Sequence, residues 1–543
     1  MNSMITTTAW VRRGVAAQFP TKYEIDEEEI NRISEIARLQ LEDAKGDLDA
    51  AREEKNDEDA MDEETDAKAA KGAGKSSANG KQDEEEDDDL KEYDLDHYDS
   101  DEVDEDGEEV TMFGNVKSLA YHQPGEKDPY LEFPEEEADE DREELQILGT
   151  DNLLVAGKVE DEVAHLEVYV YEDSADNLYV HHDIMLPAIP LCVEWLDFPV
   201  GKGVEGRTSG NFVAVGTMEP EIEIWDLDIV DCMYPNAILG PGDSNDEQSS
   251  SNKKKNKKKS KKANDEYHVD SVLALAANRQ HRNLLASASA DITVKLWDLN
   301  TQKCAKSYSY HKDKICALDW HPKESTILLS GSYDRTVVAA DMRAPEAKAP
   351  RWQVASDVEN LRWDIHDSNF FYVTTDNGIV YKYDIRNAPV ALSDSKPVWT
   401  LQAHDDSVSS FDINPTIPGF LVTGSSDKQV KLWDTANDKP SMVVSRKLEV
   451  GKVFSTSFAP DPELSFRLAV AGSKGVVQIW DTSTNAAVRR AFAGRLPDFT
   501  PGEDGHVKER IMGVNQNDES DSEDEEANDD EAQKDGWESM DED

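Results

Sequence analysis

Three histidines of this chain are each followed, at a constant spacing, by a serine and an aspartate. These residue types can relay protons or form strong hydrogen bonds. His268, His311 and His404 each begin the pattern His-x-Asp-x-(Val/Ile). The serine and aspartate that follow them at constant spacing are Ser289 with Asp291, Ser332 with Asp334, and Ser425 with Asp427. Histidine, serine and aspartate can form a nucleophilic triad. A set that recurs three times at one spacing indicates repeated architecture instead of a single catalytic site.

The elements that must position these residues are repeated as well. The string VKLWD occurs at 294–298 and again at 430–434. The related strings IEIWD, VVAAD, VYKYD and VQIWD end at Asp226, Asp341, Asp384 and Asp481. Most intervals between the closing aspartates are about 43 to 50 residues, and a period in this range that ends on a strand-forming string is typical of a propeller built from four-stranded blades.

The combination of a histidine, a serine or threonine, a turn aspartate and a closing tryptophan resembles the WD40 repeat. In that repeat these side chains form a hydrogen-bonded network within one blade, and a buried histidine and aspartate are tolerated only when such bonds satisfy them. The resemblance assigns the three histidine sets, with Trp297 and Trp433, to blade architecture. We therefore predict an all-β fold, a seven-bladed WD40 β-propeller, with an N-terminal extension that holds one short helix and with disordered acidic tracts.

Composition divides the 543 residues into four parts. We predict an N-terminal arm with an amphipathic helix over 1–44, a disordered acidic linker over 45–110, the propeller over 111–495 and a disordered acidic tail over 496–543. The formal charge is −59. The acidic tracts of the chain cannot bury enough apolar surface to fold alone. A field of this sign opposes charge-driven wrapping of nucleic acid and favours basic protein partners.

Several blades depart from the repeat pattern. A first, degenerate blade is predicted from the alternating stretches 152–159 and 165–172, with 177–186 as its link to blade two. Blade five lacks the upstream histidine, and in blade seven Lys474 stands where the turn aspartate belongs. Residues with a function beyond blade architecture are therefore expected first in these irregular blades.

The sequence allows two ways of closing the ring of blades. Residues 487–493 could supply the last outer strand, or a strand from 112–133 could close the ring instead. Either arrangement would remove exposed sheet edges. An insertion at 241–266 separates blade two from blade three and forms a lysine-rich loop.

Two further motifs suggest ligand chemistry. His181 and His182 could form a metal pair, but adjacent strand residues point to opposite faces, so we expect no joint ligation. The glycine-rich stretch 201–210 resembles a phosphate loop with Arg207 in place of lysine, but a strand follows it instead of a helix, which favours a hairpin loop. We expect no cofactor, no metal, no small-molecule substrate and no enzymatic activity.

Cysteine usage and the N-terminus bear on the compartment. The four cysteines show no Cys-x-x-Cys pair and no disulfide framework, which indicates a reducing compartment. The N-terminal residues lack the apolar region of a secretory signal, and no apolar stretch is long enough to span a membrane. We expect a soluble intracellular protein that does not bind membranes.

Candidate contact residues lie outside the repeats. Trp10, Arg12 and Arg13 stand close together, and tryptophan and arginine are the side chains that most often anchor interfaces. We predict a docking peptide here, with a disordered leader as the alternative. The insertion carries a lysine run that favours a nuclear import signal over a nucleic-acid patch, because no aromatic residues are interleaved for stacking. Its lysines are Lys253, Lys254, Lys255, Lys257, Lys258, Lys259, Lys261 and Lys262.

The acidic tail holds two candidate phosphorylation sites. Ser520 and Ser522 each have an acidic residue three positions on, the pattern that an acidophilic kinase reads. Phosphate would add further negative charge to this tail.

Segments outside the repeats carry a more specific resemblance. AWVRRGVA at 9–16, KEYDLDHYD at 91–99, DNLYVHHDIMLPAIPLCVEW at 176–195 and IEIWDLDIVD at 222–231 together resemble the periodic tryptophan protein 1 family. The resemblance implies a nuclear and nucleolar, non-catalytic assembly factor in maturation of the large (60S) ribosomal subunit precursor and in pre-rRNA processing. It implies that Trp10, Arg12 and Arg13 contact the precursor particle and that the lysine loop is the import signal.

Two partner classes follow. The first is the pre-60S particle, with its other assembly factors, ribosomal proteins and precursor rRNA. The alternative is a histone-binding or chromatin adaptor that acts on ribosomal-gene transcription. The acidic tracts suit both, because ribosomal proteins and histones are basic.

Overall fold

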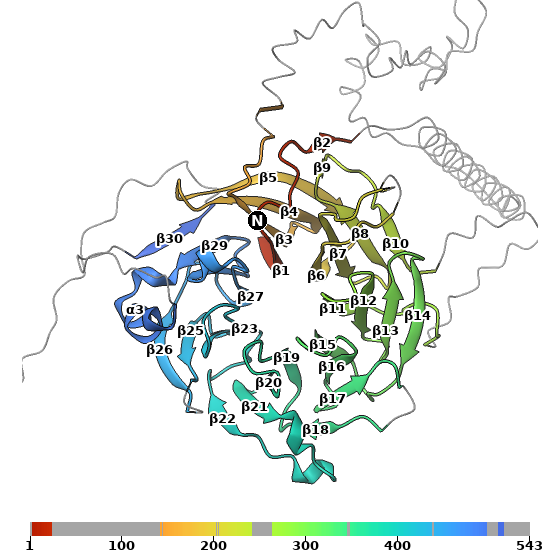
Figure 1. Ribbon diagram of the computed structural model, residues 1–543, viewed down its shortest axis with the longest axis vertical. Coiled ribbons are helices and arrows are strands. Elements are labelled where there is room, and N and C mark those ends of the chain that lie inside the picture. Colours follow the sequence, from red (N-terminus) through yellow and green to blue (C-terminus); the bar gives the residue numbers. More distant parts are fainter. Residues whose placement is uncertain are drawn as a thin grey trace, which may run out of the picture. The chain divides into compact units, whose positions relative to one another are not determined.

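The computed structural model describes residues 3–23, 142–143, 145–201, 204, 206–241, 263–344, 348–436, 439–496 and 509–514. Within these residues the strands form seven four-stranded antiparallel sheets, arranged as a ring of blades (Figure 1). The predicted seven-bladed propeller is confirmed. The predicted arm helix, acidic linker, 112–133 strand and lysine run lie outside the described residues, as does most of the predicted tail over 496–543. Within that tail, Arg510–Gly513 form a strand that pairs with blade seven, so this part of the tail prediction is wrong.

The strands of each blade run in order from the inside of the ring to its outside (Figure 1). Blade one consists of β1 (Ser3–Val11), β3 (Asn152–Glu160), β4 (Val163–Glu172) and β5 (Asn177–Leu186). Blade two consists of β6 (Pro190–Leu196), β7 (Phe212–Thr217), β8 (Ile222–Asp226) and β10 (Ala237–Leu239). Blade three consists of β11 (Val272–Ala277), β12 (Leu284–Ser289), β13 (Val294–Asp298) and β14 (Lys303–Tyr308).

The remaining blades follow the same plan. Blade four consists of β15 (Ile315–Trp320), β16 (Ile327–Ser332), β17 (Thr336–Asp341) and β18 (Arg351–Gln353). Blade five consists of β19 (Val358–Trp363), β20 (Phe370–Thr375), β21 (Ile379–Asp384) and β22 (Trp399–Gln402). Blade six consists of β23 (Ser410–Ile413), β24 (Phe420–Gly424), β25 (Val430–Asp434) and β26 (Ser441–Arg446). Blade seven consists of β27 (Val453–Phe458), β28 (Arg467–Gly472), β29 (Val477–Asp481) and β30 (Arg510–Gly513).

Short strands, an α-helix and several 3₁₀ turns lie outside the seven blades. A parallel pair, β2 (Thr21–Lys22) with β9 (Ile229–Val230), fastens the chain after β1 to blade two. One α-helix of the described part is α3 (Ala486–Phe492). The 3₁₀ turns are η4 (Ile385–Asn387), η5 (Leu392–Asp394), η6 (Pro462–Leu464), η7 (Thr482–Thr484) and η8 (Ala493–Arg495).

The hydrophobic core lies between neighbouring blades. Each apolar cluster joins two adjacent sheets; Phe212 and Ile224 of blade two, for example, pack with Val272 and Leu285 of blade three. All four side chains are fully buried. The strands are rich in β-branched and aromatic residues because both faces of a blade must be covered by its neighbours.

The N-terminus departs from the predicted domain boundaries. Residues 3–11 form β1, the inner strand of blade one, and β1 pairs antiparallel with β3. The run SMITTTAWV has the threonine and β-branched content of a strand. Its partner in the sheet is the segment from Asn152, so a search for short-range repeats could not detect it. The first residues therefore belong to the propeller and not to a separate arm.

The C-terminal closure differs from prediction as well. Residues 486–492 are helical and not the outer strand, because Asn485 accepts hydrogen bonds from the N–H groups of Ala487 and Val488 and caps the helix. Val488 and Phe492 lie on one face of this helix and are buried. The outer strand of blade seven is β30, and 177–186 is the outer strand of blade one instead of a link.

Candidate interaction surface of the propeller

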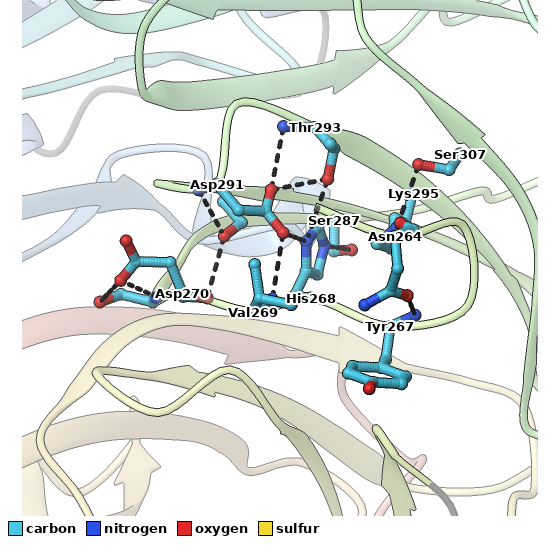
Figure 2. Close-up of polar contacts among 12 residues, drawn as sticks. Asn264, Tyr267, His268, Val269, Asp270, Ser287, Asp291, Thr293, Lys295 and Ser307 are labelled. Carbon is cyan, nitrogen blue, oxygen red and sulfur yellow. Dashed lines mark hydrogen bonds and ion pairs between the residues drawn. The ribbon is translucent and has the colours of Figure 1, made fainter. Parts of the chain in front are cut away.

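The predicted polar network exists in blade three, and Figure 2 shows His268, Ser287 and Asp291 of this network. Nδ1 of His268 lies 2.9 Å from Oδ2 of Asp291, and Nε2 lies 2.7 Å from Oγ of Ser287. Nε1 of Trp297 donates to the same Ser287 oxygen at 2.8 Å. The chain of bonds from indole to hydroxyl to imidazole to carboxylate satisfies every member.

The same network recurs in blades four and six. His311 bonds Asp334 and Ser330, and His404 bonds Asp427 and Thr423. In blade six, Trp433 donates to Thr423 Oγ1 at 2.9 Å. Blade four has Ala340 at the position of the closing tryptophan, so its hydroxyl has one partner fewer among these side chains.

The predicted serines are displaced by two residues from the true network members. Ser289 Oγ donates to the Asp270 carbonyl and accepts the N–H of Asp291, so it caps the turn before β13. Ser332 and Ser425 likewise accept the N–H groups of Asp334 and Asp427. The hydroxyl that joins histidine to tryptophan comes from the residue two positions earlier, on the strand itself. Ser287, Ser330 and Thr423 also recur at one offset from the closing aspartates, and that regularity would have identified them.

The electrostatics of the network are those of a neutral histidine beside an ionised aspartate. Burial lowers the pKa of His268, against the opposing effect of Asp291. Burial alone would raise the pKa of Asp291, but hydrogen bonds from His268 and Thr293 lower it to about 2. The distances resemble those of a Ser–His–Asp triad. The His268 side chain is fully buried and the Trp297 indole already occupies the Ser287 oxygen, so this arrangement stabilises the blade.

Trp10 closes the ring instead of projecting from it. Its side chain is 8% exposed, it packs edge-on against Tyr171, and its Nε1 donates to the carbonyl of Ser457 in blade seven at 3.1 Å. Trp320 and Trp363 donate in the same way to the inner strand of the preceding blade. The prediction of a docking contact through the Trp10 ring is therefore corrected, because that ring is buried at a contact between blades.

Arg13 also has its partners inside the propeller. Its Nε donates to Asn152 Oδ1 at 2.7 Å, and its guanidinium pairs with Glu463 at 2.5 Å. Asn152 in turn donates to Asp461 at 2.6 Å, so blade one is fastened to the η6 turn of blade seven. Arg12 is exposed, and of the three predicted contact residues it is the one whose side chain faces solvent.

Carboxylates on the inner strands form a second set of links, which sequence reasoning did not identify. Asp319 accepts the N–H of Trp363 at 2.7 Å, and Asp412 accepts the N–H of Phe458 at 2.8 Å. Each acid thus bonds the inner strand of the next blade. Burial raises the pKa of Asp319 to about 6, although the Arg362 guanidinium opposes this shift.

The structure places the histidine pair and part of the glycine-rich stretch, the two motifs that suggested ligand chemistry. The rings of His181 and His182 do not point apart as predicted: their Nδ1 atoms lie 2.8 Å apart, because the pairing of β4 with β5 shifts register here. No group of three potential metal ligands occurs in the described part of the chain. The residues 206–210 lead into strand β7, as predicted for a hairpin loop.

The predicted import lysines and Ser520 and Ser522 lie beyond the described residues, and these assignments stay predictions. Among the described helices, none has the length and apolar character that crossing a membrane requires.

The ring of blades and its His–Asp networks define the class, a WD40 propeller. The sequence matches the family described as WD domain, G-beta repeat over residues 262–298, 302–338 and 395–434. These are blades three, four and six with their flanks, where the network is present.

The chain is also similar to complete relatives beyond the WD repeats. It is 50% identical to an uncharacterized WD repeat-containing protein of Schizosaccharomyces pombe, with 94% of each chain covered. It is 38% identical to Periodic tryptophan protein 1 of Saccharomyces cerevisiae, over 91% of this chain and 90% of that protein. Identity to the Periodic tryptophan protein 1 homolog of Drosophila melanogaster is 29% over 71% of this chain and 78% of that one. The chain belongs to the periodic tryptophan protein 1 family.

Proposed function

We propose that this protein is a non-catalytic scaffold that acts in nucleolar maturation of the large ribosomal subunit precursor and in pre-rRNA processing. The observation that carries the proposal is the extent of the family relationship. Identity of 38% covers 91% of the chain, although the matched WD repeats occupy only parts of 262–434. A propeller alone identifies the fold and not the function. Segments outside the repeats therefore support the role that this family resemblance implies.

Charge supports the same partner class. The formal charge of −59 favours association with basic proteins over passive wrapping of nucleic acid. Ribosomal proteins are basic, and a precursor particle presents many of them. We propose nuclear and nucleolar localisation, with import through Lys253–Lys262, a precursor-particle contact through the exposed Arg12, and phosphorylation of Ser520 and Ser522 in the tail.

Depletion of the protein tests the role. We expect free 60S subunits to fall relative to 40S subunits in sucrose gradients, and we expect the tagged protein to co-sediment with precursor rRNA. Unchanged 60S levels after depletion would overturn the proposal. Alanine at Arg12 should weaken co-sedimentation without changing the melting temperature, because that side chain is exposed.

A histone-binding or chromatin adaptor is the second candidate. The chain is 27% identical over 40% of its length to a protein named Histone acetyltransferase type B subunit 2 of Candida glabrata, and its acidic tracts suit basic histones. Retention of the protein on nucleosomes after RNase treatment would favour this role. Loss of all chromatin association after RNase would favour the precursor particle.

A further inference from the structure

A hollow of about 960 Å³ opens where blade one meets blade seven. It is lined by the beginning of β1, the turn between β3 and β4, the connection from β5 to β6, the connection from β26 to β27, and the turn between β28 and β29. Its size is within the range of sites that enclose ligand groups or several side chains. The two blades that form it are the first and last of the ring, whose inner strands lie side by side (Figure 1).

Part of the lining is apolar. Met4, Ile189, Phe454 and Val476 line the hollow, and each is partly exposed. Met218 extends the apolar surface next to Ile189: it is 55% exposed, and its N–H donates to the Ile189 carbonyl at 3.0 Å. Methionine side chains adapt their shape to a bound group, so this lining suits an apolar side chain of a partner.

Acidic side chains stand beside this apolar lining. Asp161, Glu162 and Glu449 line the hollow and are exposed, whereas Lys474 is the one basic residue among the lining residues. The excess of carboxylates favours a cationic occupant. An acidic ligand would be repelled by these carboxylates.

The hollow occurs where the sequence departs from the blade network. Glu449 stands four residues before the start of β27, the position that His268 takes before β11, and Lys474 stands at the position of Asp291. In blade three the corresponding side chains are buried and bonded to each other. In blade seven both charged side chains are exposed, so the network that fills this end of a regular blade is replaced by an open surface.

The acidic turn is held in a strained conformation. Asp161 and Glu162 form the two-residue turn of the β3–β4 hairpin, with φ of 45° and 76°. Turns of this kind favour Asn-Gly, because a left-handed backbone is unfavourable for a residue such as glutamate. Strain that a sequence retains in a turn beside a binding surface is consistent with a functional use of that turn.

We propose that this hollow binds an extended segment of a partner protein in which an apolar side chain stands beside lysine or arginine. The apolar group would pack on Phe454 and Ile189, and the cationic groups would pair with Asp161, Glu162 and Glu449. The inference goes beyond the proposed function, since it stands on this geometry whichever basic protein supplies the segment.

The test uses the purified full-length chain and fluorescein-labelled peptides of twelve residues. The first peptide alternates leucine with arginine, the second alternates serine with arginine, and the third alternates leucine with glutamate. Anisotropy titrations in physiological salt should show the tightest binding for the leucine–arginine peptide. Asp161→Lys with Glu162→Lys should weaken this binding by about tenfold, because two attractive charges become repulsive.

Matched variants separate the site from the general field of an acidic protein. Asp394→Lys with Asp405→Lys makes the same change in net charge at exposed positions of blade five and the connection to blade six, and should weaken binding less than about twofold. Phe454→Ala should weaken binding of the leucine–arginine peptide by about fivefold and leave the serine–arginine peptide unaffected. Melting curves establish that each variant is folded, and Glu449→Lys replaces the double variant if that protein does not fold.

Four results would overturn the proposal. The two charge-reversed proteins could lose affinity equally, which would mean that only the overall field attracts the peptide. The leucine–glutamate peptide could bind as tightly as the leucine–arginine peptide. A single-stranded RNA of twelve nucleotides could displace the peptide from the wild-type protein but not bind the Phe454→Ala protein, which would assign the hollow to RNA. A 60S defect on depletion with no peptide binding would leave the proposed function standing and remove this site.

Discussion

Blades three and six differ from blades one and seven in the polar side chains that they bury. In the first two, histidine, aspartate, a hydroxyl and tryptophan form one buried network. Blade one instead buries Lys158, which pairs with Glu167 at 2.8 Å, and Tyr169 donates to the same carboxylate. In blade seven, Val470 stands where blade three has Ser287, and Nε1 of Trp480 has no hydrogen-bond partner among the described residues.

This comparison distinguishes contacts that stabilise a single blade from contacts that hold two blades together. A regular blade satisfies the polar groups of its His–Asp network within the blade. Blades one and seven have lost that network but share an extensive seam, in which Arg467 pairs with Asp173 at 2.8 Å and Thr8 bonds Ser455 at 2.7 Å. The charged residues released from the network lie at the surface around the hollow. The proposed binding surface therefore lies where the repeat pattern is absent.

The largest effect is expected at the seam. Trp10→Ala removes a buried ring and its hydrogen bond to Ser457, and should lower the free energy of unfolding by about 3–5 kcal/mol. Trp320→Ala, at the matching position of blade four, should cost a similar amount. Urea unfolding followed by circular dichroism measures both. If Trp10→Ala were as stable as the wild type while Trp320→Ala was not, β1 would not be part of the stable ring.

The network itself should show the next largest effect. His268→Ala removes one hydrogen-bond partner each from the Asp291 carboxylate and the Ser287 hydroxyl in a buried site, and should cost about 2–4 kcal/mol. Glu449→Ala removes the exposed residue at the matching position of blade seven and should change stability by less than about 0.5 kcal/mol. Equal losses in urea midpoint for the two variants would erase the distinction between these blades.

A smaller gain is expected from relief of strain in blade one. Glu162→Gly places glycine at φ of 76° and should stabilise the protein by about 1 kcal/mol. Glu162→Ala removes the charge but keeps the left-handed residue with a Cβ atom, so it should show little of this gain. A thermal melt of the three proteins distinguishes strain from charge, and a larger gain for alanine than for glycine would exclude strain as the cause.

The smallest effect concerns the tryptophan of blade seven. Val470→Thr would give Trp480 a hydroxyl acceptor like Thr423 in blade six, and should stabilise by about 0.5–1 kcal/mol. Val215→Thr makes the same change in blade two, where Trp225 already donates to Glu223, and should give no gain. A difference in melting temperature between these two variants would measure what the lost hydroxyl contributes.

The regular blades could be predicted from the sequence because their constraints are local. A closing aspartate, a turn aspartate and an upstream histidine keep fixed spacing, since one blade must bring them together within a single repeat. The serine was misplaced by two residues because Ser287 and Ser289 lie on the same side of one strand by alternation, and spacing alone does not say which hydroxyl meets the imidazole.

The seam and the hollow could not be predicted in this way. The partners of Trp10 come from residues around 152–171 and 457, far beyond any repeat period. The relative orientation of His181 and His182 was predicted wrongly, because a register shift between β4 and β5 breaks strand alternation at His181. The hollow depends on Glu449 and Lys474, which the sequence shows only as departures from a pattern.

The position of β1 has a consequence for how the protein is made. Trp10 and Ser457 are 447 residues apart in sequence, and at about 5–20 residues per second Ser457 is synthesised roughly 20 to 90 seconds after Trp10. Contacts of such long range form late, because the chain between them must first be ordered. During that interval β1 has no neighbouring blade seven. A chain that stops before Ser457 therefore lacks this cover for the Trp10 indole, and the burial of the ring reports that blade seven has joined blade one.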